Sequence, residues 1–563
     1  MRRPRPLASR DEPGQAPQQW HRVLTLLADI SLFIGTRSVW GSAASHQLVI
    51  AALISLCYAS ILVTGVLTLV VRRARTLARL DLVVLVTAVT LVFCAVLVQH
   101  AFSDESVLTT QAARELLHGH SVYGQEWPWL FRHGVAYTPT VTGGYDFTYG
   151  YPPLTMLLTV PLMWLGHGAL PETLATTTTL AVGTVVMWRM LPVRWRSAAT
   201  MVCLGFGMIP SYARLGYPAV VALAFLIPVM VRWTRMGLGG RADWGRAACL
   251  GAACAAQQLP WFLTPFLLAG VYAVRRGDIG ARGAAVAVGR IAGVAAGTWL
   301  LINAYYIVSE PVTWLSGIAL PITQGAVIHG QGLVGISLYF TDGSDRLEWY
   351  SHASMLLAAG LLAVFVLFVR RLGPAAAVLP WCAFFLATRS QDGYYLLMTP
   401  LWLAAAVTVP PSAFATAWQP RLLHGRRTAR AAVAAALVAP SLVAVALAAT
   451  GRPPLRMEAV ADSRTPLTVR TLAVRVSNTG DAPLEPHFTV TTGQGMSRYW
   501  KTVGGPASLA AHTTATYRIQ APDGRFALPR KGVRIRLRAF TATPMTLSSQ
   551  DIRLERGPVP ARR

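Results

Sequence analysis

Hydrophobic residues in this chain gather in long runs, and short polar segments rich in arginine separate them. A helix needs about 20 apolar residues to cross the hydrocarbon core of a bilayer. The clearest candidate spans are residues 47–71, 80–101, 283–308, 350–369 and 428–450, and shorter or interrupted ones are 21–40, 151–168, 172–189, 197–213, 217–233, 246–274, 374–388 and 394–410. The pattern therefore predicts a polytopic all-α membrane domain over residues 20–450, with about 11–13 transmembrane helices.

The composition agrees with this prediction. Of the 563 residues, 53% are hydrophobic and 13% are charged, whereas soluble domains carry about 25% charged residues. We therefore exclude a soluble enzyme and a disordered chain. The formal net charge of +26 comes mostly from arginines between the apolar runs. Arginines in such places orient membrane helices, so we do not expect a nucleic-acid partner.

Clusters of arginine mark the side of the membrane that faces the cytoplasm. Four such clusters lie at residues 72–79, 275–282, 370–371 and 421–430. The spans that leave this side place residues 102–150 and 309–349 outside as two large loops, with a third external turn at 389–395. Residues 1–19 are polar and Pro-rich, and we expect a disordered cytoplasmic tail there rather than a cleaved signal peptide.

One region leaves two interpretations open. The arginine-rich segments 188–196 and 231–246 have the composition of cytoplasmic loops, but simple counting of spans from residue 150 puts both outside. Either a short segment within 151–190 lies beside the membrane and 246–274 breaks into two half-helices at 257–260, or these arginines depart from the rule.

Residues 451–563 differ in kind from the rest of the chain. They are polar, with short alternating runs such as TLAVRVSN, ATYRIQA and GVRIRLRAF, separated by turn signals such as NTGD and PDG. This alternation predicts an all-β sandwich, and about 110 residues suffice to bury its core. Because an outward-running span precedes it, we expect this domain to be extracytoplasmic. Its aromatic residues could stack on sugars or simply pack in the core.

The acidic residues cluster on the predicted external face. Asp104 and Glu105 directly follow an apolar span, and the next residues predict a helix over 106–118 that ends at Gly119. The simplest interpretation is that both acids are solvated at the end of a span. The long loop closes, however, with YDFTYGYPPL at 145–154, which re-enters the membrane at once. An interfacial aromatic belt accounts for these tyrosines but not for the whole arrangement.

This arrangement resembles a known family. An acid at the end of an outward-running span, followed by AARELLHGHSVYG (112–124) and YGYPPLTMLLTVPL (149–162), is similar to the GT-C superfamily of integral-membrane glycosyltransferases. The likeness is greatest to the polyprenyl-phosphate-mannose-dependent α-mannosyltransferases of actinobacteria. QQLPWFLTPFLL (257–268) also resembles a segment of that family, in which a Lys often replaces Gln257. The resemblance covers residues 100–160 well, 255–270 moderately and 390–400 weakly, and it leaves out 451–563.

The resemblance implies that the catalytic acid opens the first large external loop, which assigns the base to Asp104, with Glu105 as its substitute. Such a base must reach the acceptor hydroxyl, and cations or hydrogen-bond donors must surround the departing phosphate. For the phosphate we single out His329 in a Gly-rich loop and Arg389 at an external turn. A loop histidine without a role and an arginine that faces lipid headgroups are the alternatives. The residues expected to line the substrate site are Tyr149, Tyr151, Gln257, Gln258, Asp392 and Tyr394.

The predicted function is transfer of a sugar, mannose first and arabinofuranose second, from a polyprenyl-monophosphate donor to an envelope glycan, glycolipid or glycoprotein. Transfer would occur at the extracytoplasmic face of the cell membrane, with inversion. No cysteine pair or Cys/His cluster predicts a metal site, and many members of the superfamily need none, so we expect neither metal nor cofactor. The alternatives are a lipid-linked-sugar transporter, which would favour inverted repeats and broken helices, and a non-enzymatic envelope scaffold.

Overall fold

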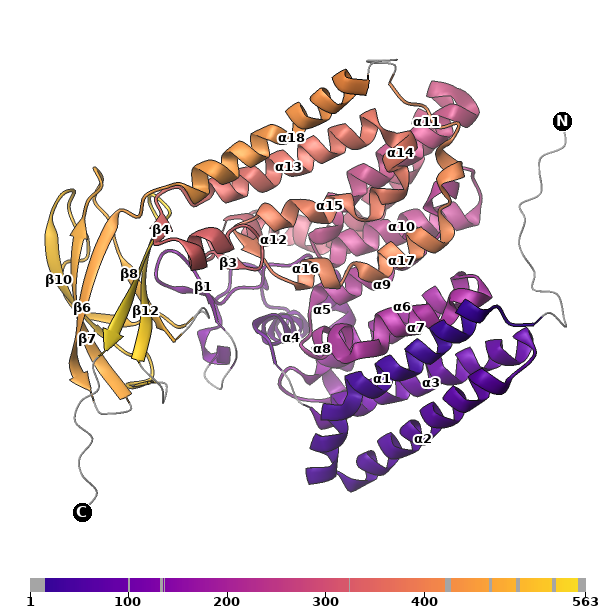
Figure 1. The fold of residues 1–563 in the computed structure, drawn as a ribbon, viewed down its shortest axis with the longest axis horizontal. Helices are drawn as coiled ribbons and strands as arrows, with labels where there is room; N and C mark the ends of the chain where they lie inside the picture. Colours follow the sequence, from indigo (N-terminus) through magenta and orange to yellow (C-terminus); the bar gives the residue numbers. More distant parts are fainter. Residues whose placement is uncertain are drawn as a thin grey trace.

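The computed structural model describes residues 16–554, apart from 100–101, 132–134, 136, 324, 421–426, 465–467, 493–496 and 529–532. It consists of a body of packed helices with a β structure at one end (Figure 1). The predicted fold class, apolar helices long enough for a membrane followed by C-terminal strands, is confirmed. Most of the predicted tail at 1–19 lies outside the described residues, and the first helix begins at Gln19.

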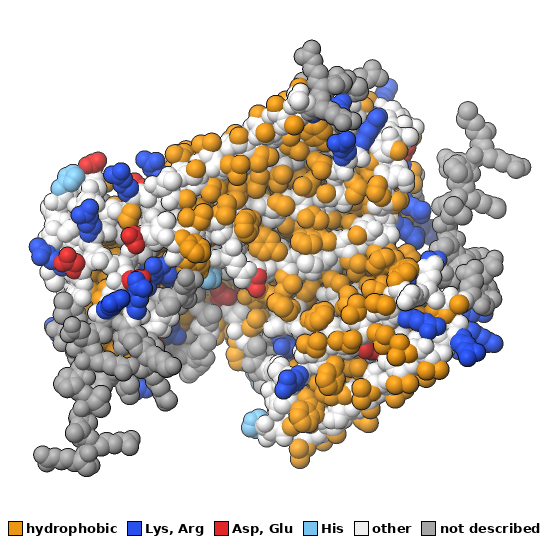
Figure 2. Space-filling view, in the orientation of Figure 1, with side chains coloured by type: hydrophobic (Ala, Val, Ile, Leu, Met, Phe, Trp, Pro, Cys, Tyr) orange, Lys and Arg blue, Asp and Glu red, His pale blue; other side chains and the backbone are white. Residues whose placement is uncertain are grey.

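Three long helices begin the chain: α1 (Gln19–His46), α2 (Leu48–Val70) and α3 (Ala74–Val98). Large apolar side chains on them, such as Leu48, Val49 and Leu56, are mostly exposed. A helix with so much exposed apolar surface is stable only where lipid surrounds it. Hydrophobic side chains cover much of the visible face of the helical body (Figure 2), as expected for a multi-pass membrane protein.

Two of the arginine-rich segments lie together at one end of this body. The segment 188–196 lies against the start of α1, where Arg194 donates to Oε1 of Gln18 at 2.7 Å and Trp195 packs on Trp20. Two further hydrogen bonds tie the same end of α1 to the turn before α3, where another arginine cluster lies. These segments therefore share one side, as the positive-inside rule expects.

The path of the chain from residue 151 favours the first of the two interpretations. α5 (Leu154–Thr159) and a short 3-10 turn meet α6 (Leu170–Met190) at a bend of 118°, so residues 151–168 do not form a separate straight span. After α6 come α7 (Arg196–Leu204), α8 (Met208–Arg214), α9 (Pro218–Met230) and α10 (Arg241–Ala256). The start of α6 lies against the end of α8, since Thr176 donates to the carbonyl of Ala213 at 2.6 Å. The arginine-rich segments after α6 and after α9 therefore lie together at the opposite end.

α11 (Leu259–Ser309) doubles back on itself. It is 51 residues long and contains Gly280, whose φ of 78° and ψ of 174° are not helical. Gln258, just before its start, donates to the carbonyl of Ile318, beyond its end, at 2.9 Å. The two arms of α11 therefore run in opposite directions, and the predicted break at 257–260 is the gap between α10 and α11.

The remaining helices are α12 (Pro311–Thr323), α13 (Glu348–Leu367), α14 (Val369–Leu372), α15 (Leu379–Cys382), α16 (Gly393–Leu396), α17 (Thr399–Thr408) and α18 (Arg427–Ala449). Among the described residues, six helices are long and apolar enough to cross a membrane, or eight if each of two bent pairs is one span. The predicted number of 11–13 is larger. The difference arises because helices such as α9 and α10 are short and because α11 counts once although it has two arms.

The C-terminal strands form two sheets around one hydrophobic core. One sheet contains β6 (Leu455–Arg464), β7 (Thr468–Asn478), β9 (Lys501–Gly504), β10 (Thr514–Gln520) and β11 (Phe526–Ala527); the other contains β8 (His487–Thr491), β12 (Val533–Thr541), β13 (Thr546–Leu554) and β4 (Gly343–Ser344). Val474 and Tyr517 of the first sheet pack with Phe488 and Leu537 of the second. Two sheets that share a core in this way form a sandwich.

One strand of this sandwich comes from the loop at 309–349. β4 pairs with β13 in antiparallel register, Ser344 opposite Leu547 and Gly343 opposite Ser548. The φ of Gly343 is +119°, and a Cβ at this position would lie 2.0 Å from the carbonyl oxygen of Leu547. Only glycine fits there. The β structure thus extends beyond residues 451–563 into a loop of the helical body.

Candidate active site

Three loops meet at the end of the helical body that adjoins the β structure (Figure 1). In the first loop, β1 (Thr138–Pro139) pairs with β2 (Tyr145–Asp146). In the other two, β3 (His329–Gly330) pairs in parallel with β5 (Arg389–Ser390). This second pairing sets His329 opposite Arg389, so the two residues predicted to bind phosphate are neighbours.

α4 (Asp104–Leu117) presents both candidate catalytic acids in its first turn. Ser103 caps the helix, since its Oγ accepts from the backbone N–H of Ser106 at 3.1 Å and the Oγ of Ser106 accepts from the N–H of Ser103 at 3.0 Å. Ser103 also donates to the carbonyl of Leu215, at 2.5 Å, which fixes α4 against the turn between α8 and α9. The helix thus begins earlier than predicted, and the positive end of its dipole lies at the acids.

Asp104 is held by two hydrogen-bond donors. Its Oδ2 accepts from the hydroxyl of Thr138 in β1 at 2.6 Å, and its Oδ1 accepts from the backbone N–H of Glu105 at 3.0 Å. Both bonds fix the orientation of the carboxylate. Each oxygen retains a further lone pair that can accept a proton from a ligand.

The Glu105 carboxyl has a raised pKa. Burial, and then the charge of Asp104, raise the pKa of the Glu105 carboxyl to about 8, against a hydrogen bond from Tyr151 and the charge of Arg389. Glu105 is therefore mostly protonated at neutral pH. Neighbouring acids whose environments separate their protonation states can take different chemical roles.

Arg389 is the cation of this cluster. Burial lowers its pKa, but Tyr394, Tyr151, Asp104 and Glu105 together raise it by more, so the guanidinium is charged. A planar guanidinium can donate two parallel hydrogen bonds to a phosphate. The structure therefore combines a carboxylate, a neutral acid and a charged guanidinium in one place.

The cluster adjoins a polar cavity of about 380 Å³, within the range of small-ligand sites. The lining residues come from the turn between α8 and α9 and from the loops that carry β3 and β5: Tyr212, Tyr217, His329, Gly330, Gln331, Tyr339, Gln391 and Asp392. Burial, and then the charges of Glu105 and Asp104, raise the pKa of the Tyr217 phenol. The two acids therefore lie close to the cavity wall.

Asp392 and His329 shape this wall. Oδ1 of Asp392 accepts from the hydroxyl of Tyr212 at 2.6 Å, which joins the third loop to α8. Burial and the charges of Arg389 and Arg538 lower the pKa of His329, so its imidazole is neutral at pH 7. Its buried Nδ1 has no hydrogen-bond partner among the described residues, and a ligand could supply one.

Of the six residues predicted to line the substrate site, Asp392 lines the cavity and the other five do not. Two of these five interact with the charged cluster instead, Tyr151 with Glu105 and Tyr394 with Arg389. The remaining three are bound to the backbone. Tyr149 is fully buried, and its hydroxyl donates to the carbonyl of Pro152 at 3.1 Å. Oε1 of Gln257 accepts from the N–H of Leu259 at 2.6 Å, at the start of α11. Gln258 donates to two backbone carbonyls, at 2.8 and 2.9 Å. All three side chains therefore form hydrogen bonds with the backbone around the site.

The β structure also contacts the loops of the site. The hydroxyl of Tyr499 donates to the carbonyl of Thr140 at 2.7 Å, and its backbone N–H donates to the hydroxyl of Tyr145 at 2.8 Å. Arg536 donates to the carbonyl of Leu338 at 3.1 Å, next to the cavity wall. Two of the three loops are thus held from the C-terminal side.

Sequence reasoning missed Thr138, Tyr212 and Tyr217. The two tyrosines lie in SYARLGYP at 211–218, whose side of the membrane the arginine count left open. Once this turn is assigned to the end opposite the arginines, its two tyrosines become candidates. Thr138 reaches Asp104 only through the folding of the first loop, and no local pattern marks it.

No model of a known protein family matches the chain, and no curated protein matches it either. Among solved structures, the chain is similar to the crystal structure of ArnT from Cupriavidus metallidurans bound to undecaprenyl phosphate, with 15% sequence identity and a TM-score of 0.34. The similarity covers 59% of this chain and 59% of that one. Because the TM-score is so low, the activity of this protein has to be inferred from its own site.

Proposed function

We propose that this protein is a GT-C-like membrane glycosyltransferase in which Asp104 is the catalytic base and Arg389 binds the phosphate of a polyprenyl-monophosphate sugar donor. The cluster of a carboxylate, a neutral acid and a charged guanidinium carries this proposal. It lies beside a polar cavity and at the end of apolar helices. A lipid-linked donor needs this combination, because its tail is apolar and its reacting end is not.

Asp104 would act as a general base. The acceptor hydroxyl attacks the anomeric carbon and gives its proton to Asp104, while the bond between that carbon and the phosphate oxygen breaks. A single displacement of this kind inverts the configuration. The hydrogen bond from Thr138 supports this role because it orients the carboxylate before the acceptor binds.

Arg389 and Glu105 would accommodate the departing phosphate. The leaving oxygen gains negative charge in the transition state, and a guanidinium already in place stabilises it. Since the pKa of Glu105 is about 8, this acid is mostly neutral at pH 7 and does not repel the phosphate. His329, opposite Arg389, could add a hydrogen bond, and Tyr151 would keep the site enclosed.

The site and the β structure would face the extracytoplasmic side. This is supported by two of the arginine-rich segments, which lie together at the opposite end of the helices. The acceptor would be an envelope glycan, glycolipid or glycoprotein, which the β structure would bind or position. Mannose is the sugar that the motif resemblance favours, and arabinofuranose is the next candidate.

Transfer of radiolabelled sugar from polyprenyl-phosphate mannose or arabinofuranose, in membranes that contain the protein, tests this proposal. Asp104→Asn should lower the rate at least about 100-fold, the usual contribution of a general base, with expression and insertion unchanged. Glu105→Gln, a matched change in the adjacent acid, should retain transfer. Absence of transfer with either donor, or full activity of the Asp104→Asn variant, would contradict it.

One observation favours transport of a lipid-linked sugar as a second candidate. Nε2 of His21 in α1 lies 2.8 Å from Oδ2 of Asp81 in α3, both residues are buried, and Ser197 donates to Asp81 at 2.5 Å. Ionisable groups within membrane helices often mark ion pathways. Movement of a polyprenyl-phosphate sugar between the two leaflets of vesicles that contain the protein tests this candidate. If Asp81→Asn abolishes this movement and Asp104→Asn does not affect it, the result would support transport over transfer.

A further inference from the structure

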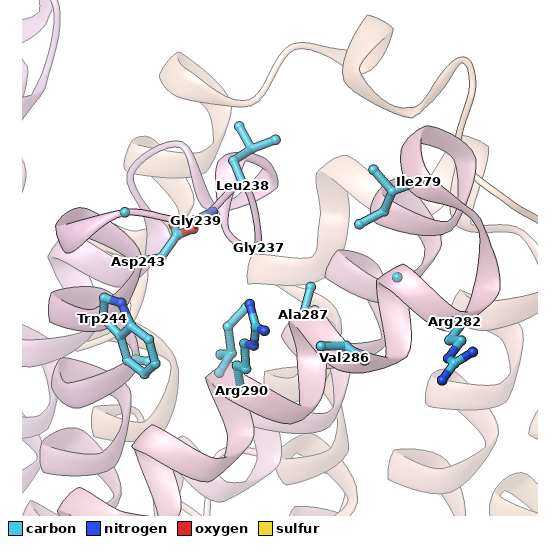
Figure 3. Close-up of a pocket in the computed structure, with 14 residues that line it drawn as sticks. Gly237, Leu238, Gly239, Asp243, Trp244, Ile279, Arg282, Val286, Ala287 and Arg290 are labelled. Carbon is cyan, nitrogen blue, oxygen red and sulfur yellow. Dashed lines mark hydrogen bonds between the residues drawn. The ribbon is translucent and has the colours of Figure 1, made fainter.

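A second cavity, of about 550 Å³, lies at the arginine-rich end of the helical body, away from the candidate active site. It opens between the loop before α10 and the reversal in α11 (Figure 3). Its wall is largely apolar, and its large side chains are exposed: Leu238 by 65%, Trp244 and Ile279 by 54% each, and Val286 by 47%. An exposed apolar surface of this kind favours contact with lipid.

Two arginines stand in this apolar surrounding. Arg290 points into the cavity between Trp244 and Ala287, and Arg282 stands at its rim (Figure 3). Both are exposed, and neither has a hydrogen bond or an ion pair with another described residue. Each guanidinium therefore has all its donors available to a ligand.

The cavity has fewer acidic than basic side chains. Asp243 is the one acid among the lining residues, and its Oδ2 accepts from the backbone N–H of Gly239 at 2.6 Å. It thus holds the rim in place. The cavity retains a net positive charge, which favours an anionic occupant.

The rim leaves the entrance open. Gly239 and Gly240 have φ values of +87° and +107°, and a Cβ on either would meet no atom within 4 Å. The neighbouring Gly237 is tighter, because a Cβ there would lie 3.1 Å from Arg275. No side chain therefore blocks the entrance at Gly239 and Gly240, so a headgroup can enter there, while Gly237 remains packed against Arg275.

We propose that this cavity binds the phosphate headgroup of an anionic phospholipid from the leaflet at the arginine-rich end. Arg290 would hold the phosphate with paired N–H donors, Arg282 would add positive charge at the rim, and the exposed apolar wall would contact the acyl chains. Basic pockets between membrane helices have this recognition chemistry. A free phosphate would satisfy the arginines but would leave Leu238, Trp244 and Ile279 without a partner.

Binding of a fluorescent phosphatidylglycerol to the full-length protein in neutral detergent tests this site. Arg282→Gln combined with Arg290→Gln should weaken binding about thirtyfold, as expected for two basic residues at an anionic headgroup. The control removes two exposed arginines at the same end of the molecule, Arg75→Gln with Arg79→Gln, and should leave binding unchanged. Equal losses in both double variants, or none in the first, would overturn the proposal.

A second variant tests the cavity while it keeps both charges. Val286→Trp fills the space from an exposed position, so it should weaken phosphatidylglycerol binding at least about tenfold and leave the fold intact. Inorganic phosphate at millimolar concentration should not displace the lipid. Full binding by the Val286→Trp variant, or displacement by inorganic phosphate alone, would show that the occupant is not a lipid in this cavity.

Discussion

Asp104 and Glu105 are neighbours on α4, yet they contact different groups. Adjacent residues on a helix point about 100° apart, so Asp104 reaches Thr138 in the first loop while Glu105 reaches Tyr151. Their unequal surroundings let one acid accept a proton while the other stays mostly neutral. At the scale of residues, this division makes the pair suitable for moving a proton beside a phosphate.

Glu105 predicts how stability depends on pH. Its pKa is about 8 in the folded protein, against an ordinary value of 4.5, so between these values the folded protein holds a proton that the unfolded chain has lost. Stability should therefore fall as the pH rises through this window and level off above it. Glu105→Gln, which mimics the neutral acid, should raise the melting temperature at pH 8 and change it little at pH 4. Equal shifts at both pH values would contradict this assignment.

Arg389 predicts a difference between two substitutions. Arg389→Lys keeps the charge but loses the paired donors, and we expect the KM for the donor to rise about tenfold. Arg389→Met also leaves Asp104 without its cation, and transfer should fall about 100-fold or more. Arg346→Met, at an exposed position of the second loop, is the control and should keep full activity in the same transfer assay. Equal activity of the three variants would remove Arg389 from the site.

At the scale of elements, the reversal in α11 decides which helices can meet. It returns the chain to the end of the body where α12 begins, so that Gln258 and Ile318 come into contact. Without it, the loop with β3 could not reach β5. The reversal depends on Gly280, which takes a backbone conformation that is nearly exclusive to glycine.

Gly280→Ala tests this dependence. A Cβ at Gly280 would meet no atom within 4 Å, so any loss of stability comes from the backbone alone, and we expect about 1–3 kcal/mol. Gly289→Ala, in the second arm of α11, also meets no atom and should be neutral or stabilising by up to about 1 kcal/mol. Thermal unfolding in detergent measures both variants. A Gly280→Ala protein as stable as the Gly289→Ala protein would show that the reversal does not need glycine.

The sequence predicts those elements that depend on local patterns. Long apolar runs predict the helices, period-two alternation predicts the strands after residue 451, and the polar break at 257–260 predicts the gap before α11. The bend of 118° before α6 falls at the predicted boundary between 151–168 and 172–189, but no local pattern gives its angle. No local pattern predicts β4 either, because two residues are too short to show alternation and their pairing with β13 depends on the whole fold.

For the candidate site, too, the sequence predicts the residues that have a local signal and misses those that do not. Asp104, Glu105, His329 and Arg389 stand out in the sequence by residue type and by their position next to spans, and the structure brings them together. Their partners do not stand out. The hydrogen bond between Tyr212 and Asp392, for example, joins residues 180 positions apart, which only packing of the helices can bring about.

At the scale of the whole molecule, the site lies between two structures. The helical body carries its three loops, and the β structure holds two of them through Tyr499, Arg536 and the strand β4. An acceptor bound by the β structure would thus lie next to the end of the helices that carries the candidate active site. If the proposed function is correct, this placement lets a lipid donor approach from the helices and a water-soluble acceptor approach from the β structure.

The orientation of the molecule can be tested with single cysteines. Asp481→Cys places a thiol on the β structure, where this side chain is 98% exposed, and Arg75→Cys places one at the arginine-rich end. In a background with the exposed Cys382 changed to Ala, a membrane-impermeant maleimide added to intact cells should label position 481 and not position 75. The opposite labelling pattern would reverse the assigned sidedness.

A map of the full-length protein bound to a polyprenyl-monophosphate sugar that cannot be transferred tests the central claim most directly. We predict phosphate density within about 3 Å of the Arg389 guanidinium, a hydrogen-bond distance, with the anomeric carbon next to Asp104 and the lipid tail along the apolar helices. A saturating ligand found elsewhere on the protein, with both side chains unoccupied, would contradict the account.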